Sequence, residues 1–184
     1  VGKREPEIRR ALDLGVGCIN LESESELNRV IKVSNELGKT APIGIRINPD
    51  VDPKTHPYIA TGRRDNKFGI EIQEAKAMFR RVANISNIEI KGLACHIGSQ
   101  LLEIQPFIDA VEKVVDFLNQ LAEEEIELSQ IDIGGGLGIR YNEENPPEPE
   151  SYANAIVDIM ERRGFRIPVM IEPGRAIIGN AGIF

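Results

Sequence analysis

The sequence predicts an α/β protein, a partial (β/α)8 TIM barrel in which about five βα units are present. Two observations indicate this fold class. Short apolar runs rich in β-branched residues alternate with longer amphipathic segments along the 184 residues, which is typical of βαβ units and a parallel sheet. Polar, motif-like residues follow the ends of the apolar runs, and parallel α/β folds bind their ligands at the carboxyl ends of the strands.

An open, doubly wound sheet is the alternative architecture. Such a sheet concentrates its ligand site at one switch point, whereas a barrel can use every strand end. Here each strand end offers polar or glycine residues: Asn20 and Glu22, Asn48, His96 and Ser99, Gly134–Gly136, and Glu172 with Arg175. The barrel is therefore favoured. Because five strands cannot close an eight-stranded barrel, about three units are expected to lie outside these residues.

The first half of the chain is expected to form two helices and two strands. A helix over residues 5–14 has a proline in its first turn and a glycine just after its end, the positions that these residues prefer. Residues 18–21 form a short apolar strand. The spacing Ser23-x-x-Glu26 is a capping box that begins the next helix, and the apolar run at 42–48 is the next strand.

A long polar loop over residues 49–66 separates the two halves, and loops of this length are usually functional or mobile. The second half then repeats the alternation of helical stripes and continuous β-branched runs. The expected elements are helices at 71–83, 105–124 and 148–163 and strands at 88–97, 131–133 and 168–171.

The composition is that of an ordinary globular domain with an acidic balance. The formal net charge is -7, and the Lys and Arg residues are scattered, which argues against a nucleic-acid partner. Two cysteines without a CxxC spacing predict neither a disulfide framework nor a metal site. The cysteine usage fits a reducing cytoplasm, and no apolar run reaches the length of a membrane span, so we expect a cytoplasmic protein. Because the chain begins with Val1 and ends in an apolar run, we expect an internal piece of a longer protein.

A glycine-rich turn, Gly134–Gly136, follows the strand at 131–133. Its bare backbone N–H groups could bind a phosphate, because no side chain blocks the approach. A tight strand-to-helix turn is the alternative, since the spacing matches neither the GxGxxG fingerprint nor a P-loop. Arg46, on the strand at 42–48, is expected to be either salt-bridged or in contact with a ligand, because arginine is rarely buried unpaired.

His96 and Glu172 each lie at the end of an apolar strand. A lone histidine is more often structural than catalytic, but His96 is followed by Gly98 and Ser99, and a flat ring beside a hydroxyl could hold a planar phosphorylated cofactor. A carboxylate in apolar surroundings needs a partner. Arg175 would give Glu172 an ion pair, whereas a protonated ring nitrogen would make that ring an electron acceptor.

Taken in order, these motifs resemble diaminopimelate decarboxylase, of the alanine-racemase-like, fold type III family of pyridoxal-phosphate enzymes. The resemblance rests on HIGSQ at 96–100, the GGG turn, EPGR at 172–175 and the stretches 46–62 and 66–70, and it covers residues 18–179. Gln100 and residues 55–62 favour diaminopimelate decarboxylase over ornithine decarboxylase.

The resemblance implies pyridoxal 5'-phosphate as the cofactor. It implies that His96 lies against the ring face, that Ser99 and the glycines bind the phosphate, and that Glu172 pairs with the pyridine nitrogen. Arg175 would reach the phosphate or a substrate carboxylate. The catalytic residues implied are His96 and Glu172, and the implied cofactor-binding set is His96, Ser99, Gly134, Gly135, Gly136, Glu172, Pro173, Gly174, Arg175 and Arg46.

Two parts of the family pattern are missing from these residues. The lysine that forms a Schiff base with the cofactor belongs to a YAxKAN-like motif, and no such motif occurs here, since Lys3 only precedes a helix. The C-terminal β-domain, with its Cys-Glu pair and tyrosines, is also absent. We therefore expect residues 1–184 to be part of the cofactor-binding barrel domain and to be inactive alone.

The implied reaction of the full-length protein removes CO2 from the D-centre of meso-diaminopimelate and gives L-lysine, and a homodimer is expected. One alternative is a related decarboxylase acting on arginine, ornithine or carboxynorspermidine. Another is a non-catalytic fragment of a cofactor-binding barrel. A barrel that binds a flavin or a sugar phosphate would explain the glycines but not HIGSQ together with EPGR.

Overall fold

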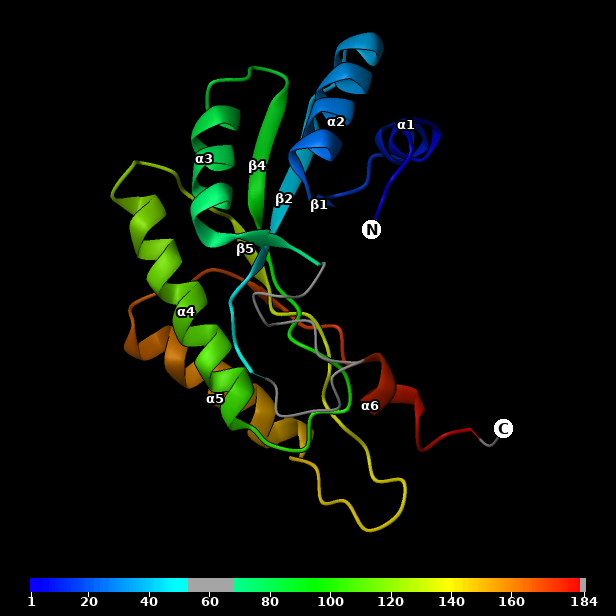
Figure 1. Cartoon of the computed structure of the whole chain (residues 1–184), viewed down its shortest axis with the longest axis vertical. Coiled ribbons are helices and arrows are strands. Elements are labelled where there is room, and N and C mark those ends of the chain that lie inside the picture. Colours follow the sequence, from blue (N-terminus) through cyan, green and yellow to red (C-terminus); the bar gives the residue numbers. More distant parts are fainter. Residues whose placement is uncertain (53–67, 183–184) are drawn as a thin grey trace.

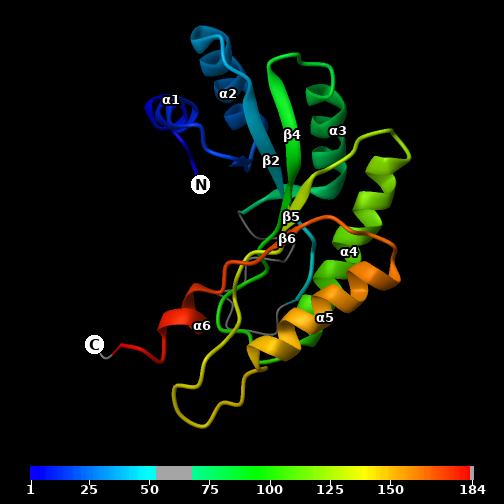
Figure 2. The same cartoon turned by 180° about the vertical axis from the view of Figure 1, so that it is seen from behind.

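The computed structural model describes residues 1–52 and 68–182, which form one parallel sheet with helices packed along it (Figures 1 and 2). The sheet order is β1-β2-β4-β5-β6, the short β3 pairs with β2, and every pairing is parallel. The strands are β1 (Ile19–Leu21), β2 (Ala41–Asn48), β3 (Ile70–Glu71), β4 (Ile88–Ala94), β5 (Gln130–Asp132) and β6 (Val169–Met170). The helices are α1 (Glu5–Leu14), α2 (Glu24–Leu37), α3 (Ile72–Val82), α4 (Gln105–Ala122), α5 (Pro149–Arg162) and α6 (Gly174–Ile178).

Glycines end the first two helices, as the sequence predicts. Gly15 follows α1 with a φ of 68°, and Gly38 follows α2 with a φ of 61°. Both values lie in the left-handed region, which costs glycine little because it has no Cβ. These two caps turn the chain back towards the sheet, so that α2 packs on β1 and β2.

The predicted capping box at the start of α2 is only half formed. The Ser23 hydroxyl accepts a hydrogen bond from the Glu26 N–H at 3.2 Å, as expected. The Glu26 carboxylate does not return to Ser23. It accepts hydrogen bonds from the backbone N–H groups of Lys3 (2.8 Å) and Glu22 (2.9 Å) instead, because the segment before α1 passes beside it.

The two faces of the sheet differ in chemistry. On β2, Ile43, Ile45 and Ile47 are fully buried and belong to the single hydrophobic core that the helices cover. Side chains alternate along a strand, so Arg46 lies on the opposite face. The register pairs Arg46 with Ala94 on β4, and Ala94 with Asp132 on β5. Arg46 and Asp132 therefore lie in one row across the carboxyl ends of three strands, with Ala94 between them.

The successive βα units and the all-parallel order confirm the predicted fold class, a partial (β/α)8 barrel. Three details differ from the sequence-based expectation. The strand expected at 88–97 ends at Ala94, because the next residues leave the sheet to meet the glycine turn. The short β3 and α6 were not expected, since two and five residues are too few to show a period. The loop beyond residue 52 lies outside the described residues, as do residues 55–62.

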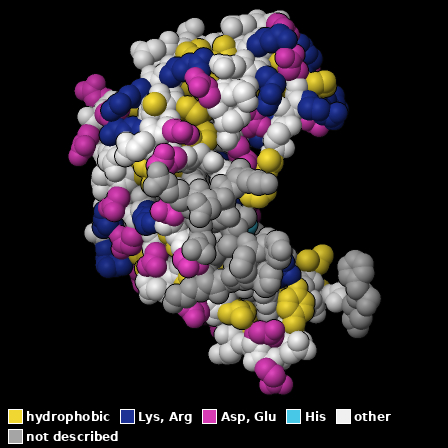
Figure 3. Space-filling view, viewed as in Figure 1, with side chains coloured by type: hydrophobic (Ala, Val, Ile, Leu, Met, Phe, Trp, Pro, Cys, Tyr) yellow, Lys and Arg dark blue, Asp and Glu magenta, His cyan; other side chains and the backbone are white. Residues whose placement is uncertain are grey.

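The described surface agrees with the predicted scatter of charge. Figure 3 shows Lys and Arg side chains intermingled with Asp and Glu over the described part of this face. Within residues 1–52 and 68–182, no helix has both the length and the apolar composition needed to cross a membrane.

Candidate functional site

A cavity of about 340 Å³ lies at the carboxyl ends of the strands. Its lining comes from the strands of the main sheet or the residues just after them, and from the segment before α1: Asn20 and Glu22, Arg46, Ala94–His96, Asp132, Glu172, and Val1 with Lys3. His96 and Glu172 therefore lie at the same edge of the sheet and face one space. This is the arrangement that the barrel interpretation requires.

The three glycines of the turn after β5 are needed for close packing. A Cβ at Gly134 would lie 2.5 Å from the Cys95 carbonyl oxygen, and one at Gly135 would lie 2.1 Å from that of Glu172. A Cβ at Gly136 would lie 2.3 Å from the Gly98 carbonyl oxygen. The turn is thus wedged between the loops after β4 and β6. The glycines bring the HIGSQ and EPGR motifs together, whether or not they also bind a phosphate.

Hydrogen bonds fix this junction. The Gly135 N–H donates to His96 Nδ1 at 3.2 Å, and the Glu172 N–H donates to the Gly134 carbonyl oxygen at 2.8 Å. The Gly135 bond requires an unprotonated Nδ1, so the neutral ring carries its proton on Nε2. Burial and the positive charge of Arg46 lower the pKa of His96, opposed by the carboxylate of Asp132. His96 therefore presents a neutral ring to the cavity.

We expect the stability contribution of His96 to depend on pH. The pKa of His96 in the folded state lies below its usual value of 6.5, so the unfolded state takes up the proton first as the pH falls. The stabilisation is complete above 6.5 and declines as the pH drops from 6.5 towards the lower folded pKa. The test is chemical denaturation of the full-length protein and of its His96→Gln variant between about pH 8 and pH 5. The wild-type advantage should shrink at low pH, and a constant or growing advantage would contradict this assignment.

Ser99 and Arg175 meet beside the glycine turn. An Arg175 Nη donates to the Ser99 hydroxyl oxygen at 2.9 Å, and the guanidinium lies 5.9 Å from the centre of the Tyr141 ring and donates to its hydroxyl. Within the described residues, no ion pair joins Arg175 to Glu172, so the expected structural alternative for Glu172 is wrong. Neither Ser99 nor Arg175 lines the cavity that holds His96.

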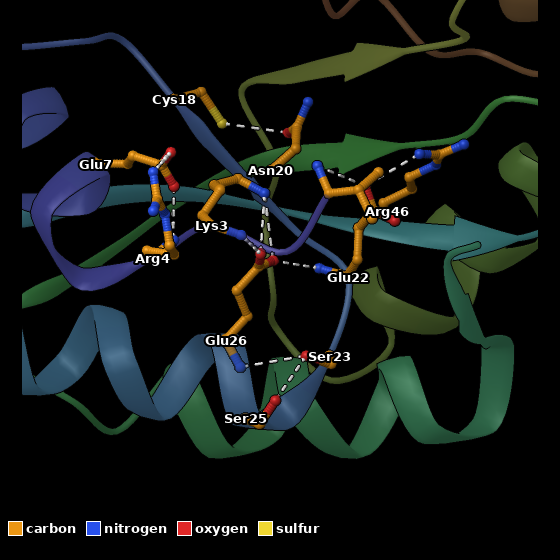
Figure 4. A network of polar contacts seen from close by, with 11 residues as sticks. Lys3, Arg4, Glu7, Cys18, Asn20, Glu22, Ser23, Ser25, Glu26 and Arg46 are labelled. Carbon is orange, nitrogen blue, oxygen red and sulfur yellow. Dashed lines mark hydrogen bonds and ion pairs between the residues drawn. The ribbon is translucent and has the colours of Figure 1, made fainter. Parts of the chain in front are cut away.

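Arg46 is salt-bridged, as one of the two alternatives predicts, and it also lines the cavity. Figure 4 shows its guanidinium beside the Glu22 carboxylate, at 3.0 Å, with both side chains largely buried. The Phe68 ring lies 5.5 Å from its guanidinium carbon. The same view shows Lys3 beside Glu26, whose 1% exposed carboxylate pairs with the ammonium at 3.2 Å. Among the residues that the structure describes, the lysine that lines the cavity is thus already paired with a carboxylate.

The sequence analysis missed Asp132. This carboxylate is 5% exposed, lines the cavity, and accepts a hydrogen bond from the Gly134 N–H at 2.8 Å. Burial raises the pKa of Asp132. The signal was present, because Asp132 interrupts an apolar strand just as Glu172 follows one. Tyr141 was also missed, since nothing in the sequence places it near Arg175.

The remaining residues of the implied set shape the loop after β6. Pro173 precedes α6 as its N-cap, and the Gly174 N–H donates to the Glu172 carbonyl oxygen at 2.8 Å. A Cβ at Gly174 would meet nothing within 4 Å, so this glycine is not required by packing. Pro173 and Gly174 thus form the turn between Glu172 and the start of α6.

The donor set fits a planar phosphorylated cofactor. Ser99 and Arg175 offer a hydroxyl and a cation at one point, which is the donor chemistry that a phosphate prefers. Among the described residues, no group accepts a hydrogen bond from the partly exposed Gly136 N–H. His96 offers a neutral flat ring, and Glu172 offers an exposed carboxylate on the same cavity. Groups suited to the phosphate, the ring face and the ring nitrogen of such a cofactor are therefore present at one edge of the sheet.

Comparisons with known proteins identify the family of the chain. Residues 1–179 match the family model described as pyridoxal-dependent decarboxylase, pyridoxal binding domain. The chain is similar to the diaminopimelate decarboxylases of Vibrio cholerae (50% identical) and Haemophilus influenzae (47% identical), each over 183 residues. The matches cover 100% of this chain and 44% of each relative, so the chain spans less than half of their length.

Solved structures of similar proteins include another diaminopimelate decarboxylase. The diaminopimelate decarboxylase of Helicobacter pylori, in complex with L-lysine, has a TM-score of 0.92 and 40% identity, covering 96% of this chain and 44% of that one. Lysine decarboxylase of Selenomonas ruminantium, 22% identical with a TM-score of 0.79 over 94% of this chain and 42% of that one, shares the fold. Because the family model spans residues 1–179, the chain belongs to the pyridoxal-dependent decarboxylases, within their pyridoxal binding domain.

Proposed function

We propose that this chain is part of the cofactor-binding barrel of an enzyme that removes CO2 from meso-diaminopimelate and releases L-lysine. The observation that carries the proposal is the cavity shared by His96 and Glu172, with Ser99 and Arg175 paired beside it. Relatives at 47–50% identity are named for this activity, and the Helicobacter pylori relative is described in complex with L-lysine, the expected product.

The chain's own residues would hold pyridoxal 5'-phosphate between two loops. The Ser99 hydroxyl, the Gly136 N–H and the Arg175 guanidinium bind the phosphate, and the neutral His96 ring packs on the pyridine ring. Glu172 holds the proton on the pyridine nitrogen. Arg46, held by Glu22, supplies a fixed positive charge near His96. Pro173 and Gly174 direct Glu172 and Arg175 into the site.

When bound, the cofactor supplies an electron sink for the electron pair left on carbon as CO2 departs. The residues of this chain would orient the cofactor and adjust the charge around its ring. Glu172 keeps the ring nitrogen protonated, because a nearby carboxylate favours the charged form of a base. His96 stays neutral and so adds no second positive charge to the ring face. Arg175 is also placed to meet a substrate carboxylate.

The lysine that binds the cofactor covalently is proposed to come from outside these residues. Lys3 lines the cavity, but its ammonium is paired with the buried Glu26 carboxylate. The proton donor and the closing strands of the barrel would also come from elsewhere in a longer protein. We propose that this full-length protein is a cytoplasmic homodimer with a small amino acid as substrate and no nucleic-acid or membrane partner.

The test is release of CO2 by the full-length protein loaded with pyridoxal 5'-phosphate. We expect kcat/KM for meso-diaminopimelate to exceed that for ornithine, arginine and carboxynorspermidine by at least about 10²-fold, because a site built for a polar group rejects analogues that lack it. The 184-residue chain alone should stay at background. Faster turnover of another amine would refute the substrate, and no turnover of any of them would refute the function. Turnover by the chain alone would show that no outside lysine is needed.

A further inference from the structure

The loops that follow β4 and β5 are joined by a short ladder of hydrogen bonds. The Leu101 N–H donates to the Gly136 carbonyl oxygen at 2.8 Å, and the Gly138 N–H donates to the Leu101 carbonyl oxygen at 3.0 Å. Leu101 and Leu137 accordingly form an isolated parallel bridge. The loop that carries Ser99 and the loop that carries Gly136 are thus held in register beyond the end of the sheet.

The Gln100 side chain extends this ladder by one residue. Its Nε2 donates to the Ile139 carbonyl oxygen at 2.5 Å, and its Oε1 accepts from the Ile139 N–H at 3.1 Å. An amide is the side-chain group that can satisfy a backbone N–H and C=O together. Gln100 itself has a φ of 55°, a left-handed value that is uncommon for a residue other than glycine. The backbone adopts this conformation while the amide makes both bonds.

Ile139 passes the restraint on to the third loop. A Cβ at Gly179 would lie 2.3 Å from Ile139 Cδ1, so the end of α6 packs directly on this side chain. The Gly179 N–H in turn donates to the carbonyl oxygen of Arg175, at 2.7 Å. Arg175 donates to the hydroxyl of Ser99, the neighbour of Gln100. The contacts therefore form a closed ring, and the Gln100 amide is the link that joins two of its loops.

We propose that Gln100 is a positioning residue that holds Ser99, Gly136 and Arg175 together as one phosphate-binding site. It touches neither ring nor substrate, and it acts through Ile139. The inference rests on the proposed function, because it assigns Gln100 to the phosphate end of the same cofactor. A purely structural glutamine would affect folding, whereas a positioning residue should affect affinity for the phosphate selectively.

The experiment compares the binding of pyridoxal 5'-phosphate and of pyridoxal, which lacks the phosphate, to the full-length protein by cofactor absorbance. Gln100→Met has a similar length and removes both hydrogen bonds. Two bonds of about 1 kcal/mol each predict a loss of affinity for pyridoxal 5'-phosphate of about tenfold to thirtyfold. Affinity for pyridoxal should change less than about threefold, since its ring contacts are not altered.

Two further variants keep the result interpretable. Gln100→Glu retains the acceptor for the Ile139 N–H but loses the donor to the Ile139 carbonyl oxygen. It replaces Gln100→Met if that variant fails to fold, and the same selective loss of affinity for pyridoxal 5'-phosphate is expected. Gln73→Met, at an exposed position on α3, is the matched control and should bind both compounds as the wild type does. Equal losses for the two compounds, or no loss, would overturn the inference. A wild-type protein that binds neither compound would instead refute the proposed function.

Discussion

Replacing Glu172 by glutamine in the full-length enzyme is expected to lower kcat on the order of 10²–10³-fold, as does the loss of one preorganised electrostatic contact in other enzymes. The variant should still retain the cofactor. A neutral amide fits the same space but cannot hold a proton on the ring nitrogen, so the site loses its ability to accept electrons. Turnover and bound-cofactor absorbance are measured on the same preparation.

The matched control for this prediction is Glu143→Gln, because the Glu143 side chain is 97% exposed and lies on the loop after β5. The control should leave both readings unchanged. If Glu172 had only a structural role, its variant would lose thermal stability while the rate per folded, cofactor-loaded molecule stayed near wild type. Since Glu172 forms no ion pair with Arg175 within the described residues, we expect a lower rate per cofactor-loaded molecule and an unchanged thermal stability.

Replacing Gly135 by alanine is expected to separate the glycine turn from the loop after β6. The added Cβ would lie 2.1 Å from the Glu172 carbonyl oxygen, and this contact is with backbone that cannot rotate away. Overpacking of this kind costs about 1–3 kcal/mol. For a protein of this size or larger, that corresponds to a fall in Tm of at most roughly 2–4 °C per kcal/mol. Cofactor affinity should fall as well, because the Glu172 main chain must move.

Gly17→Ala is the control for this substitution. A Cβ at Gly17 would meet nothing within 4 Å, and its φ is not in the left-handed region, so only the flexibility of the unfolded chain changes. Thermal unfolding and cofactor titration of both variants in the full-length protein give the comparison. Equal behaviour of Gly135→Ala and Gly17→Ala would contradict the close packing of the two loops.

Much of the site could be predicted because its residues break the local rules of their strands. His96, Glu172 and Arg46 are polar groups at the ends of apolar runs, and a parallel sheet gathers such ends at one edge. The structure places all three on one cavity. The boundary of β4 was misplaced because Cys95 and Ile97 continue the apolar pattern after the strand has ended at Ala94. The pattern of apolar residues in the sequence shows which residues are buried, but a buried residue need not be hydrogen-bonded to a neighbouring strand.

Contacts between loops could not be predicted in the same way. The sequence does not show that Tyr141 meets Arg175 or that Gln100 reaches Ile139. The residues of each pair lie on different loops, and their contact depends on how these loops are placed relative to each other in the fold. The ion pair between Glu172 and Arg175 was a reasonable expectation from sequence proximity. It fails because the chain begins α6 at Gly174 and turns Arg175 towards Ser99.

The central claim is that the three motifs form one binding site for pyridoxal 5'-phosphate. A crystal structure of the full-length protein with this cofactor tests the claim most directly. We expect Ser99, Gly136 and Arg175 within about 3.2 Å of the phosphate oxygens and the Glu172 carboxylate within the same distance of the pyridine nitrogen. His96 should lie against the ring. A cofactor bound elsewhere, or with its ring nitrogen directed away from Glu172, would contradict the account.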